Sequence, residues 1–511
     1  MKAHRDEDIV DAVVIGTGAG GAPILSRLAG AGLSVVALEA GSNRHPEAEF
    51  VADEAASGSL YWMKERISGG PTPEAFGANN SGTGVGGSTL HWGAFVPRAD
   101  PRDLQLKTTT GHGEDWPIKH AELVPYYEEV EAFIGVSGPR NYPWDPARRY
   151  GFAPVARNAP AQAMAAGCEA LGLRYADAPA ALVSQAVEQP AHGTRHGCVG
   201  CGYCHQGCRN SAKVSMDVTY LPLALADGAE IRPDCFAHGF ERDARGEISA
   251  VLYRHEGRER RQRCRTVFLC AGAVETPRLL LHAGLANGSG QVGRNYTAHV
   301  ATQVWGTFEP EMRMNKGYPS SIITEDMVRP ADADFVGGYL VQSLGVVLQT
   351  FADQVARGRG LWGQPLVDYL RSYNHLAGIG INGECLPSED NEMTLSDEVD
   401  DTGLPEPLIR FGYGENEKRL RAHAVRFMTN VWEAAGARDI WVLERTAHTI
   451  GTCRMGTDRE RSVVDATGRS FDVPNLWIAD NSTFPSALAA NPALTIMALS
   501  LRTADAFLAA R

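Results

Sequence analysis

The sequence predicts an α/β fold of the α+β type, with a Rossmann-like parallel sheet as its first part. Three stretches carry this prediction: the β-branched run DAVVIG at 11–16, the helical pattern APILSRLAGAGL at 22–33, and the apolar run SVVALEAG at 34–41. Strand, glycine turn, helix and strand in this order open a doubly wound sheet. With 511 residues, 44% of them hydrophobic, the chain has the length for roughly two to four domains with sizeable cores.

The glycine turn GTGAGG at 16–21 predicts a dinucleotide site. Gly16 allows a tight turn, Gly18 lets the backbone approach a pyrophosphate, and Gly21 lets helix and strand pack closely, so that the anion lies at the positive end of the helix. Glu39 ends the second strand, where its carboxylate can accept hydrogen bonds from both ribose hydroxyls. This carboxylate disfavours the 2′-phosphate of NADP, which leaves NAD or FAD. A glycine-rich turn without a ligand is the alternative interpretation.

The charge balance argues against nucleic acid as a partner. The formal net charge is -13, and the arginine-rich run RHEGRERRQRCR at 254–265 is expected to be a solvated hairpin. No secretory leader is recognised, because charged residues precede an apolar run that enters a glycine turn. The longest apolar stretch, 487–501, is interrupted by Asn491-Pro492 and is too short to span a bilayer. We therefore expect no transmembrane segment and a cytoplasmic protein, with export on a partner's signal left open.

Four further motifs decide between the two dinucleotides. They are a second glycine loop, GTGVGGSTLHWGAFVPR at 82–98; a buried strand running into a helix at 267–284; QVGRNYTAH at 291–299; and a C-terminal set at 448–505 that begins HTIGTCRMG. Together with the first glycine turn, in this order and spacing, they resemble the glucose–methanol–choline (GMC) family of FAD-dependent oxidoreductases. The resemblance covers roughly half of the chain and makes FAD the expected cofactor.

The resemblance implies a FAD-binding Rossmann-like domain and a second, substrate-binding domain built on an antiparallel sheet. We expect the FAD domain to be discontinuous and to comprise 1–110, 209–300 and 440–511. The substrate domain then comprises 111–208 and 301–439. Three β-like runs, at 229–241, 247–254 and 265–272, predict a small antiparallel meander beside the parallel sheet.

His448 and Asn491 are the candidate catalytic pair. Taken alone, Asn491 before a proline and an apolar helical run predicts a plain N-cap with Pro492 as the first helical residue, and His448 predicts a structural histidine. The resemblance places both in the active site. A neutral imidazole is suited to take the hydroxyl proton as hydride leaves carbon, and the Asn491 amide can donate to the developing alkoxide.

The resemblance also implies cofactor contacts from the second glycine loop and the C-terminal motif, at Gly86, Gly87, Ser88, His91, Asp480 and Pro492. The helix after Asn491 would direct its positive end at the flavin edge that becomes negative on reduction. His91 precedes Trp92, and in pyranose oxidases of the family a histidine at such a position carries a covalently attached flavin. Sugar dehydrogenases of the family share the dipeptide, so it does not establish a bond.

Four clustered cysteines, Cys198, Cys201, Cys204 and Cys208, form the pattern C-x2-C-x2-C-x3-C, which is that of bacterial ferredoxins without the final proline. The spacing suits an iron–sulfur cluster better than a zinc site with separated knuckles, and two disulfides across such short loops would be strained. The segment also resembles the cysteine-bearing loop of sugar dehydrogenases in the family. Iron–sulfur, zinc and unmetallated structural thiols remain three open interpretations.

The expected activity is FAD-dependent oxidation of a CH–OH group to a carbonyl. A sugar, glycoside or polyol is the favoured substrate, and a protein or a quinone is the expected electron acceptor, with an iron–sulfur cluster as an intermediate carrier. The runner-up is an O2-using oxidase of aliphatic or aromatic alcohols whose cysteines are structural.

Overall fold

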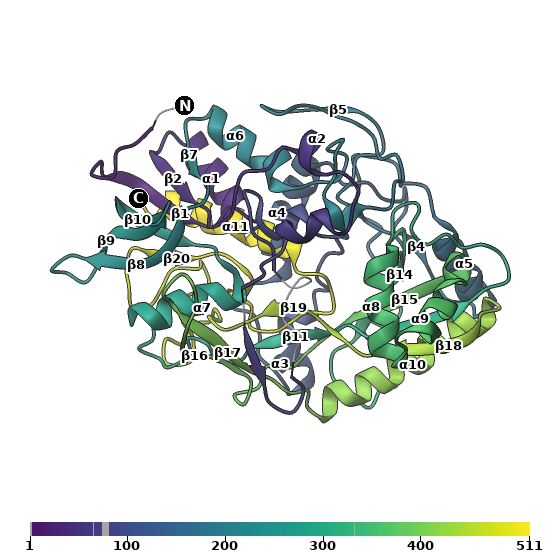
Figure 1. Cartoon of the computed structure of the whole chain (residues 1–511). Coiled ribbons are helices and arrows are strands. Elements are labelled where there is room, and N and C mark those ends of the chain that lie inside the picture. Colours follow the sequence, from purple (N-terminus) through teal and green to yellow (C-terminus); the bar gives the residue numbers. More distant parts are fainter. Residues whose placement is uncertain (1–2, 65, 74–80, 332) are drawn as a thin grey trace.

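Two large β-sheets organise the chain in the computed structural model, which describes residues 3–64, 66–73, 81–331 and 333–511 (Figure 1). Within these residues the first sheet has seven strands, in the order β7-β2-β1-β10-β9-β8, with β20 beside β10. The strands are β1 (Val10–Ile15), β2 (Val35–Leu38), β7 (Glu230–Arg232), β8 (Phe236–Arg242), β9 (Ile248–His255), β10 (Arg258–Leu269) and β20 (Leu476–Ile478).

The parallel part of this sheet consists of β7, β2, β1, β10 and β20. Apart from the half-buried Asp11, strands β1 and β2 are apolar and buried, as expected for parallel strands covered on both faces. The first helix, α1 (Gly21–Gly30), and the last, α11 (Ala493–Ala509), pack against each other beside these strands, which brings the two ends of the chain together (Figure 1). The predicted Rossmann-like sheet is thereby confirmed.

The predicted meander is partly wrong. The run at 229–241 divides into β7, which joins the parallel sheet beside β2, and β8, which pairs with β9. Strand β10 is long enough to pair with β9 at its first half and with β1 at its second, so the meander continues the parallel sheet instead of lying beside it. The arginine-rich run forms the exposed β9–β10 hairpin, as expected.

The second sheet has eight strands in the described part of the chain, and all of its printed pairings are antiparallel. Its main order is β18-β12-β15-β14-β13-β4, and β11 pairs with both β15 and β19. Its strands are β4 (Ala176–Asp177), β11 (Thr297–Val300), β12 (Gln303–Thr307), β13 (Ile322–Thr324), β14 (Tyr339–Leu344), β15 (Leu376–Gly383), β18 (Arg438–Leu443) and β19 (Thr446–Ile450). An antiparallel second sheet was predicted, but three of its strands, β11, β18 and β19, come wholly or partly from segments assigned to the FAD domain.

Helices α5 (Ala159–Ala170) and α10 (Glu415–Ala434) pack against this sheet, and α4 (His120–Ile134) packs against α11. The other α-helices are α2 (Pro46–Glu49), α3 (Leu106–Thr110), α6 (Tyr220–Ala226), α7 (Gly272–Ala283), α8 (Leu348–Arg359) and α9 (Gln364–Leu370). Two small sheets are formed by β3 (Ile67–Gly69), β16 (Glu392–Val399) and β17 (Pro405–Arg410), and by β5 (Val187–Gln189) and β6 (Gly193–Arg195). Among the described residues, none of these helices combines the length and apolar character needed to cross a membrane.

Candidate active site

The first glycine turn joins β1 to α1 as predicted. A Cβ at Gly21 would stand 1.9 Å from the carbonyl oxygen of Gly16, so only glycine allows the helix to begin so close to the strand. At Gly18 a Cβ would meet nothing closer than 3.6 Å. Gly18 therefore leaves an approach to the backbone at the positive end of α1, where a pyrophosphate can bind.

Glu39 ties the two glycine loops together. Its Oε2 accepts hydrogen bonds from the backbone N (3.0 Å) and Oγ1 (2.7 Å) of Thr17, and its Oε1 accepts from the backbone N of Gly41 (3.0 Å) and Gly84 (3.4 Å). Burial raises the pKa of this carboxyl, and the four hydrogen bonds oppose the shift. The contact of Glu39 with a ribose stays a prediction. Thr17, which occupies a variable position of the motif, could not be singled out from the sequence.

The second glycine loop lies directly over the first. A Cβ at Gly87, whose φ is 56°, would approach the Cα of Gly18 to 2.8 Å. The backbone N of Gly86 donates to Thr17 Oγ1 (3.1 Å), and Ser88 Oγ accepts from the backbone N of Gly82 (2.9 Å). The close approach explains why both loops are built from glycine.

A cavity of about 460 Å³ opens between these loops and the second sheet. Most of the predicted site residues line it: Gly16, Gly18, Glu39, Gly87, Ser88, His91, His448, Asp480, Asn491 and Pro492. Gly21 and Gly86 do not, because Gly21 is packed against the Gly16 backbone and Gly86 against the Leu90 side chain. The four cysteines do not line it either, although Gly202, His205 and Gln206 of their loop do.

His91 is buried beside this cavity with an unused ring nitrogen. Burial lowers its pKa to about 3, with Lys213 as a further cause, so the imidazole is neutral. Its Nε2 has no hydrogen-bond partner within the described chain. A buried polar atom without a partner is costly, and a group bound in the cavity would satisfy it.

Asp480 and the C-terminal helix are placed near the first glycine turn. The Asp480 carboxylate accepts from the backbone N of Gly272 (2.8 Å) at the start of α7, from Thr276 Oγ1 (2.7 Å), and from the backbone N of Ser482 (2.8 Å). Helix α11 begins at Ala493 and has Pro492 in its cap position, so the predicted start is one residue early.

The N-cap interpretation of Asn491 is wrong. No side-chain hydrogen bond caps α11. Instead, Asn491 Oδ1 accepts from Asn382 Nδ2 (3.0 Å), which belongs to β15 of the second sheet. This contact fixes which way the Asn491 amide faces, since its oxygen is occupied. Its Nδ2 group is thereby left as the donor available to the cavity.

His448 is held by a second histidine that the sequence analysis quoted without giving it a role. His448 lies on β19 with a φ of 59°, a strained value for a residue other than glycine. Its Nδ1 is 2.8 Å from Nδ1 of His299, on the neighbouring strand β11. His299 is fully buried, and burial lowers its pKa to about 4.

The partners of His299 determine the tautomers of both rings. His299 Nε2 is 2.9 and 3.0 Å from the carbonyl oxygens of Ala487 and Leu488. Carbonyl oxygens only accept, so Nε2 carries the hydrogen and donates it to them, and Nδ1 of neutral His299 must accept. His448 Nδ1 is therefore the donor. The lone pair of His448 is left on Nε2, which makes no hydrogen bond to the described part of the chain.

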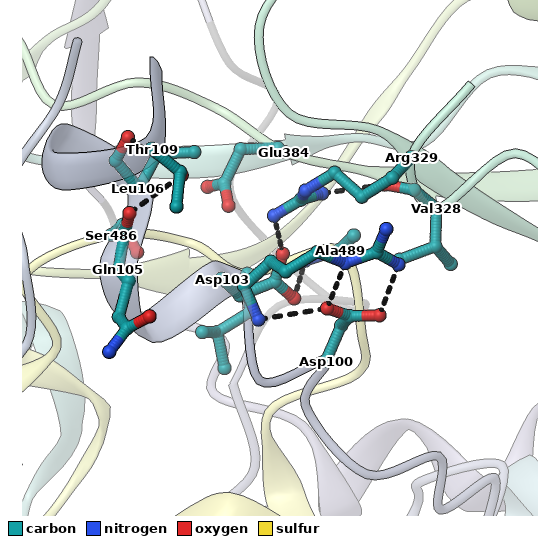
Figure 2. A network of polar contacts seen from close by, with 12 residues as sticks. Asp100, Asp103, Gln105, Leu106, Thr109, Val328, Arg329, Glu384, Ser486 and Ala489 are labelled. Atoms are coloured by element: carbon teal, nitrogen blue, oxygen red, sulfur yellow. Dashed lines mark hydrogen bonds and ion pairs between the residues drawn. The ribbon is translucent and has the colours of Figure 1, made fainter. Parts of the chain in front are cut away.

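A buried acidic network anchors the segment that carries these carbonyls (Figure 2). Asp103 is fully buried, forms an ion pair with Arg329, and accepts from the backbone N of Ala489 (3.0 Å) through Oδ2. Glu384, which follows β15 directly, is also fully buried. Burial raises its pKa far above the usual carboxyl range, and the nearby Asp103 adds to the shift, so Glu384 is the protonated member of the pair.

The cysteine-rich loop connects to the second glycine loop through Lys213. The buried Lys213 ammonium donates to the carbonyl oxygens of Thr89 (3.3 Å), Leu90 (2.8 Å) and Trp92 (3.3 Å), and burial lowers its pKa to about 8. Its backbone N donates to Cys208 Sγ (3.3 Å).

All ten cysteines are free, which removes the disulfide interpretation of the loop. Cys201 is exposed and Cys204 is buried. Burial raises the pKa of the Cys204 thiol, and the nearby Lys213 ammonium opposes the shift. No three His, Cys, Asp or Glu side chains of the described residues stand together in a way that would hold a metal ion. Four thiols on one loop fit an iron–sulfur cluster in donor type, but not in their present arrangement.

The fold and the cavity define a dinucleotide-binding protein with proton-handling side chains beside its nucleotide site. Two family models, each described as GMC oxidoreductase, match residues 70–301 and 387–500. The chain belongs to the GMC family of FAD-dependent oxidoreductases.

The chain is 30% identical to the fructose dehydrogenase large subunit of Gluconobacter japonicus, over 98% of this chain and 97% of that protein. It is 31% identical to 6'''-hydroxyparomomycin C oxidase of Streptomyces lividus, over 99% of this chain and 93% of that one. Among solved structures, pyridoxine 4-oxidase from Mesorbium loti shares the fold with a TM-score of 0.70 at 16% identity, over 98% of this chain and 99% of that chain. Dehydrogenases and oxidases both occur among the relatives.

The described residues fit a bound FAD. The glycine turn leaves room for the pyrophosphate at the start of α1, and the cavity continues from there to His448 and Asn491. The unpartnered Nε2 of His91 borders the same cavity.

Proposed function

We propose that the protein oxidises a CH–OH group of a sugar, glycoside or polyol to a carbonyl, with His448 as the general base and with an electron acceptor other than O2. The observation that carries the proposal is the His299–His448 pair, whose hydrogen bonds leave a lone pair on His448 Nε2 at the cavity. FAD, when bound, supplies the hydride acceptor.

The chain's own residues handle the proton and the substrate oxygen. His448 Nε2 takes the hydroxyl proton, and its Nδ1–H continues to donate to His299, which supports the resulting imidazolium. The Asn491 Nδ2 group donates to the oxygen as negative charge develops there, because its own Oδ1 is held by Asn382. The buried Asp103–Arg329 pair holds Ala489 in place, and with it the segment that leads to Asn491.

A sugar or polyol substrate is supported by the relatives. Fructose dehydrogenase is named for a sugar, and another relative, 30% identical over 98% of this chain, is named 2-methyl-1,2-propanediol dehydrogenase, after a diol. These two relatives are dehydrogenases by name, whereas the 31% identical relative from Streptomyces lividus is an oxidase by name. A panel of fructose, glucitol, benzyl alcohol and butanol, assayed in air and with a quinone acceptor, tests substrate class and acceptor together. Faster turnover of simple alcohols with O2 than with the quinone would favour the oxidase.

The pH dependence of kcat/KM follows from the lowered pKa of His448. Burial lowers this pKa well below the usual value. Catalysis needs the neutral ring, and a lowered pKa keeps the ring neutral to lower pH. We expect kcat/KM to stay level as pH falls through about 6.5, the ordinary histidine pKa, and to decline only below it. An acid limb centred at or above that pH would contradict the assignment.

The cysteine-rich loop is the proposed route by which electrons leave the cavity for an external acceptor. The loop extends from the cavity, which Gly202 and His205 line, to the surface, where Cys201 and Val199 are exposed. Cys198, Cys201, Cys204 and Cys208 have the donor type for an iron–sulfur cluster, but the loop would have to rearrange to bring them together, because the described residues do not form a metal site as they stand. We expect protein purified without oxygen to contain iron and acid-labile sulfide, and both to disappear in a Cys204→Ser variant. Protein that has full flavin but neither iron nor sulfide would exclude the cluster.

A further inference from the structure

Two glutamines face each other across a glycine on the cavity side of the second sheet. Gln303 of β12 is paired with Gly380 of β15, and Gly380 is paired on its other side with Gln342 of β14. All three residues line the cavity that holds His448 and Asn491. Because side chains at paired positions of neighbouring strands lie on the same face, the two amides form a row with a gap at its centre. We refer to these three residues as the amide row.

The gap depends on the missing side chain of Gly380. A Cβ there would stand 2.9 Å from Leu344 Cδ1 and 3.3 Å from Gln303 Cγ, both closer than ordinary contact. A larger residue would therefore fill the space between the two amides. The glycine keeps this part of the cavity floor open to a ligand.

Both amides have hydrogen-bonding capacity that the protein leaves unused. Gln303 Oε1 accepts from Trp305 Nε1 (3.3 Å), and its Nε2 makes no hydrogen bond to the described part of the chain. Gln342 Oε1 is buried and has no partner among the described residues. The row thus presents a donor from one strand and an acceptor from another. A hydroxyl group can satisfy both kinds, since it donates one hydrogen and accepts at its oxygen.

The amide row stands at a fixed distance from the proposed catalytic pair. Asn382 lies two residues beyond Gly380 on β15 and therefore on the same face, about 7 Å further along the strand. Its Nδ2 donates to Asn491 Oδ1 (3.0 Å). A sugar ring or the carbon chain of a polyol spans a distance of this order. A monohydric alcohol oxidised at His448 would leave the amide row unsatisfied.

We infer that Gln303 and Gln342 form a subsite for a second hydroxyl of the substrate, remote from the carbon that is oxidised, so that the enzyme selects polyhydroxylated substrates. The inference rests on the proposed function, which it deepens by assigning residues to the substrate class. The energetic basis is the cost of leaving buried amides unpaired when an apolar alcohol binds.

The test compares two kinds of substrate in the holoenzyme. Gln342→Met and Gln303→Met keep side-chain length but remove the amide. We expect each to lower kcat/KM for the best of fructose, glucitol and methyl glucoside by roughly 10- to 100-fold, and kcat/KM for benzyl alcohol by less than about threefold. Gln349→Met, an exposed position on α8, is the matched control and should change neither. Flavin content and melting temperature show which variants fold. If Gln342→Met does not fold, Gln342→Asn takes its place, because it keeps the amide but shortens the side chain by one methylene.

The outcomes separate this inference from the proposed function. If the glutamine variants lose kcat/KM equally on both substrate kinds, or on neither, the amide row does not bind a hydroxyl. Neither result bears on the role of His448 as the base. Wild-type enzyme that oxidises benzyl alcohol but none of the polyhydroxylated compounds would overturn the subsite and the proposed sugar or polyol substrate, but not His448 as the general base. If none of the tested alcohols reduces the flavin of the wild-type holoenzyme, the proposed function is overturned, and the subsite with it.

Discussion

Replacing His448 by alanine is expected to lower kcat/KM for alcohol oxidation by roughly 10²- to 10⁴-fold, the usual contribution of a positioned general base. The variant loses the lone pair on His448 Nε2. The other three ring nitrogens of His299 and His448 are already engaged in hydrogen bonds. The rest of the cavity is unchanged, so flavin content should stay at the wild-type level. Steady-state kinetics at neutral pH, with flavin quantified by absorbance after denaturation, measure both.

The matched control is His112→Ala, at an exposed position between α3 and α4. It should leave kcat/KM and flavin content unchanged. A His448→Ala enzyme that keeps its flavin and turns over within a few-fold of wild type would remove His448 from the mechanism.

Replacing Asp103 by alanine is expected to destabilise the fold by about 3–5 kcal/mol, the usual cost of breaking a buried ion pair. The variant leaves the Arg329 charge without its partner and the backbone N of Ala489 without an acceptor (Figure 2). Glu384 is not a ready substitute as the partner of Arg329, because burial raises its pKa and ionising it costs free energy. Chemical unfolding followed by tryptophan fluorescence and by flavin release measures the loss.

Asp100→Ala offers the comparison within the same network. Asp100 pairs with Arg102, whose side chain is 55% exposed, so this removal should cost only about 1 kcal/mol or less. Equal losses in the two variants would mean that the buried pair contributes no more than a surface pair. The Asp103 variant should also lose activity at temperatures where it remains folded, since Ala489 lies between the carbonyls that hold His299 and the catalytic candidate Asn491.

Features set by local backbone geometry were predictable from the sequence. The turn from β1 into α1 needs glycine at Gly16 for its φ of 92° and at Gly21 because a Cβ there would meet Gly16, and the acidic residue after β2 follows the same local pattern. Four of the five ordered motifs contribute residues to the lining of one cavity, and the fifth carries His299, which contacts His448. The arginine-rich hairpin was also readable, because a turn between two polar strands is a local feature.

Features that depend on sheet pairing were not predictable. His299 and His448 are 149 residues apart, and they meet only because β11 pairs with β19. Asn382 and Asn491 are 109 residues apart and come together across the boundary between the second sheet and α11. For Asn491 the local rule predicted a cap, and a tertiary contact took precedence. The amide row likewise requires the register of three strands, which no short pattern contains.

The most direct test of the account is the rate at which an alcohol bleaches the enzyme's flavin without oxygen, followed by stopped-flow absorbance. This half-reaction isolates proton removal from whatever acceptor follows. The account predicts that His448→Ala slows bleaching roughly 10²- to 10⁴-fold, and that His299→Ala, which frees His448 Nδ1 from its acceptor, slows it less. Bleaching as fast in His448→Ala as in wild type, for every alcohol that reduces the wild-type enzyme, would contradict it.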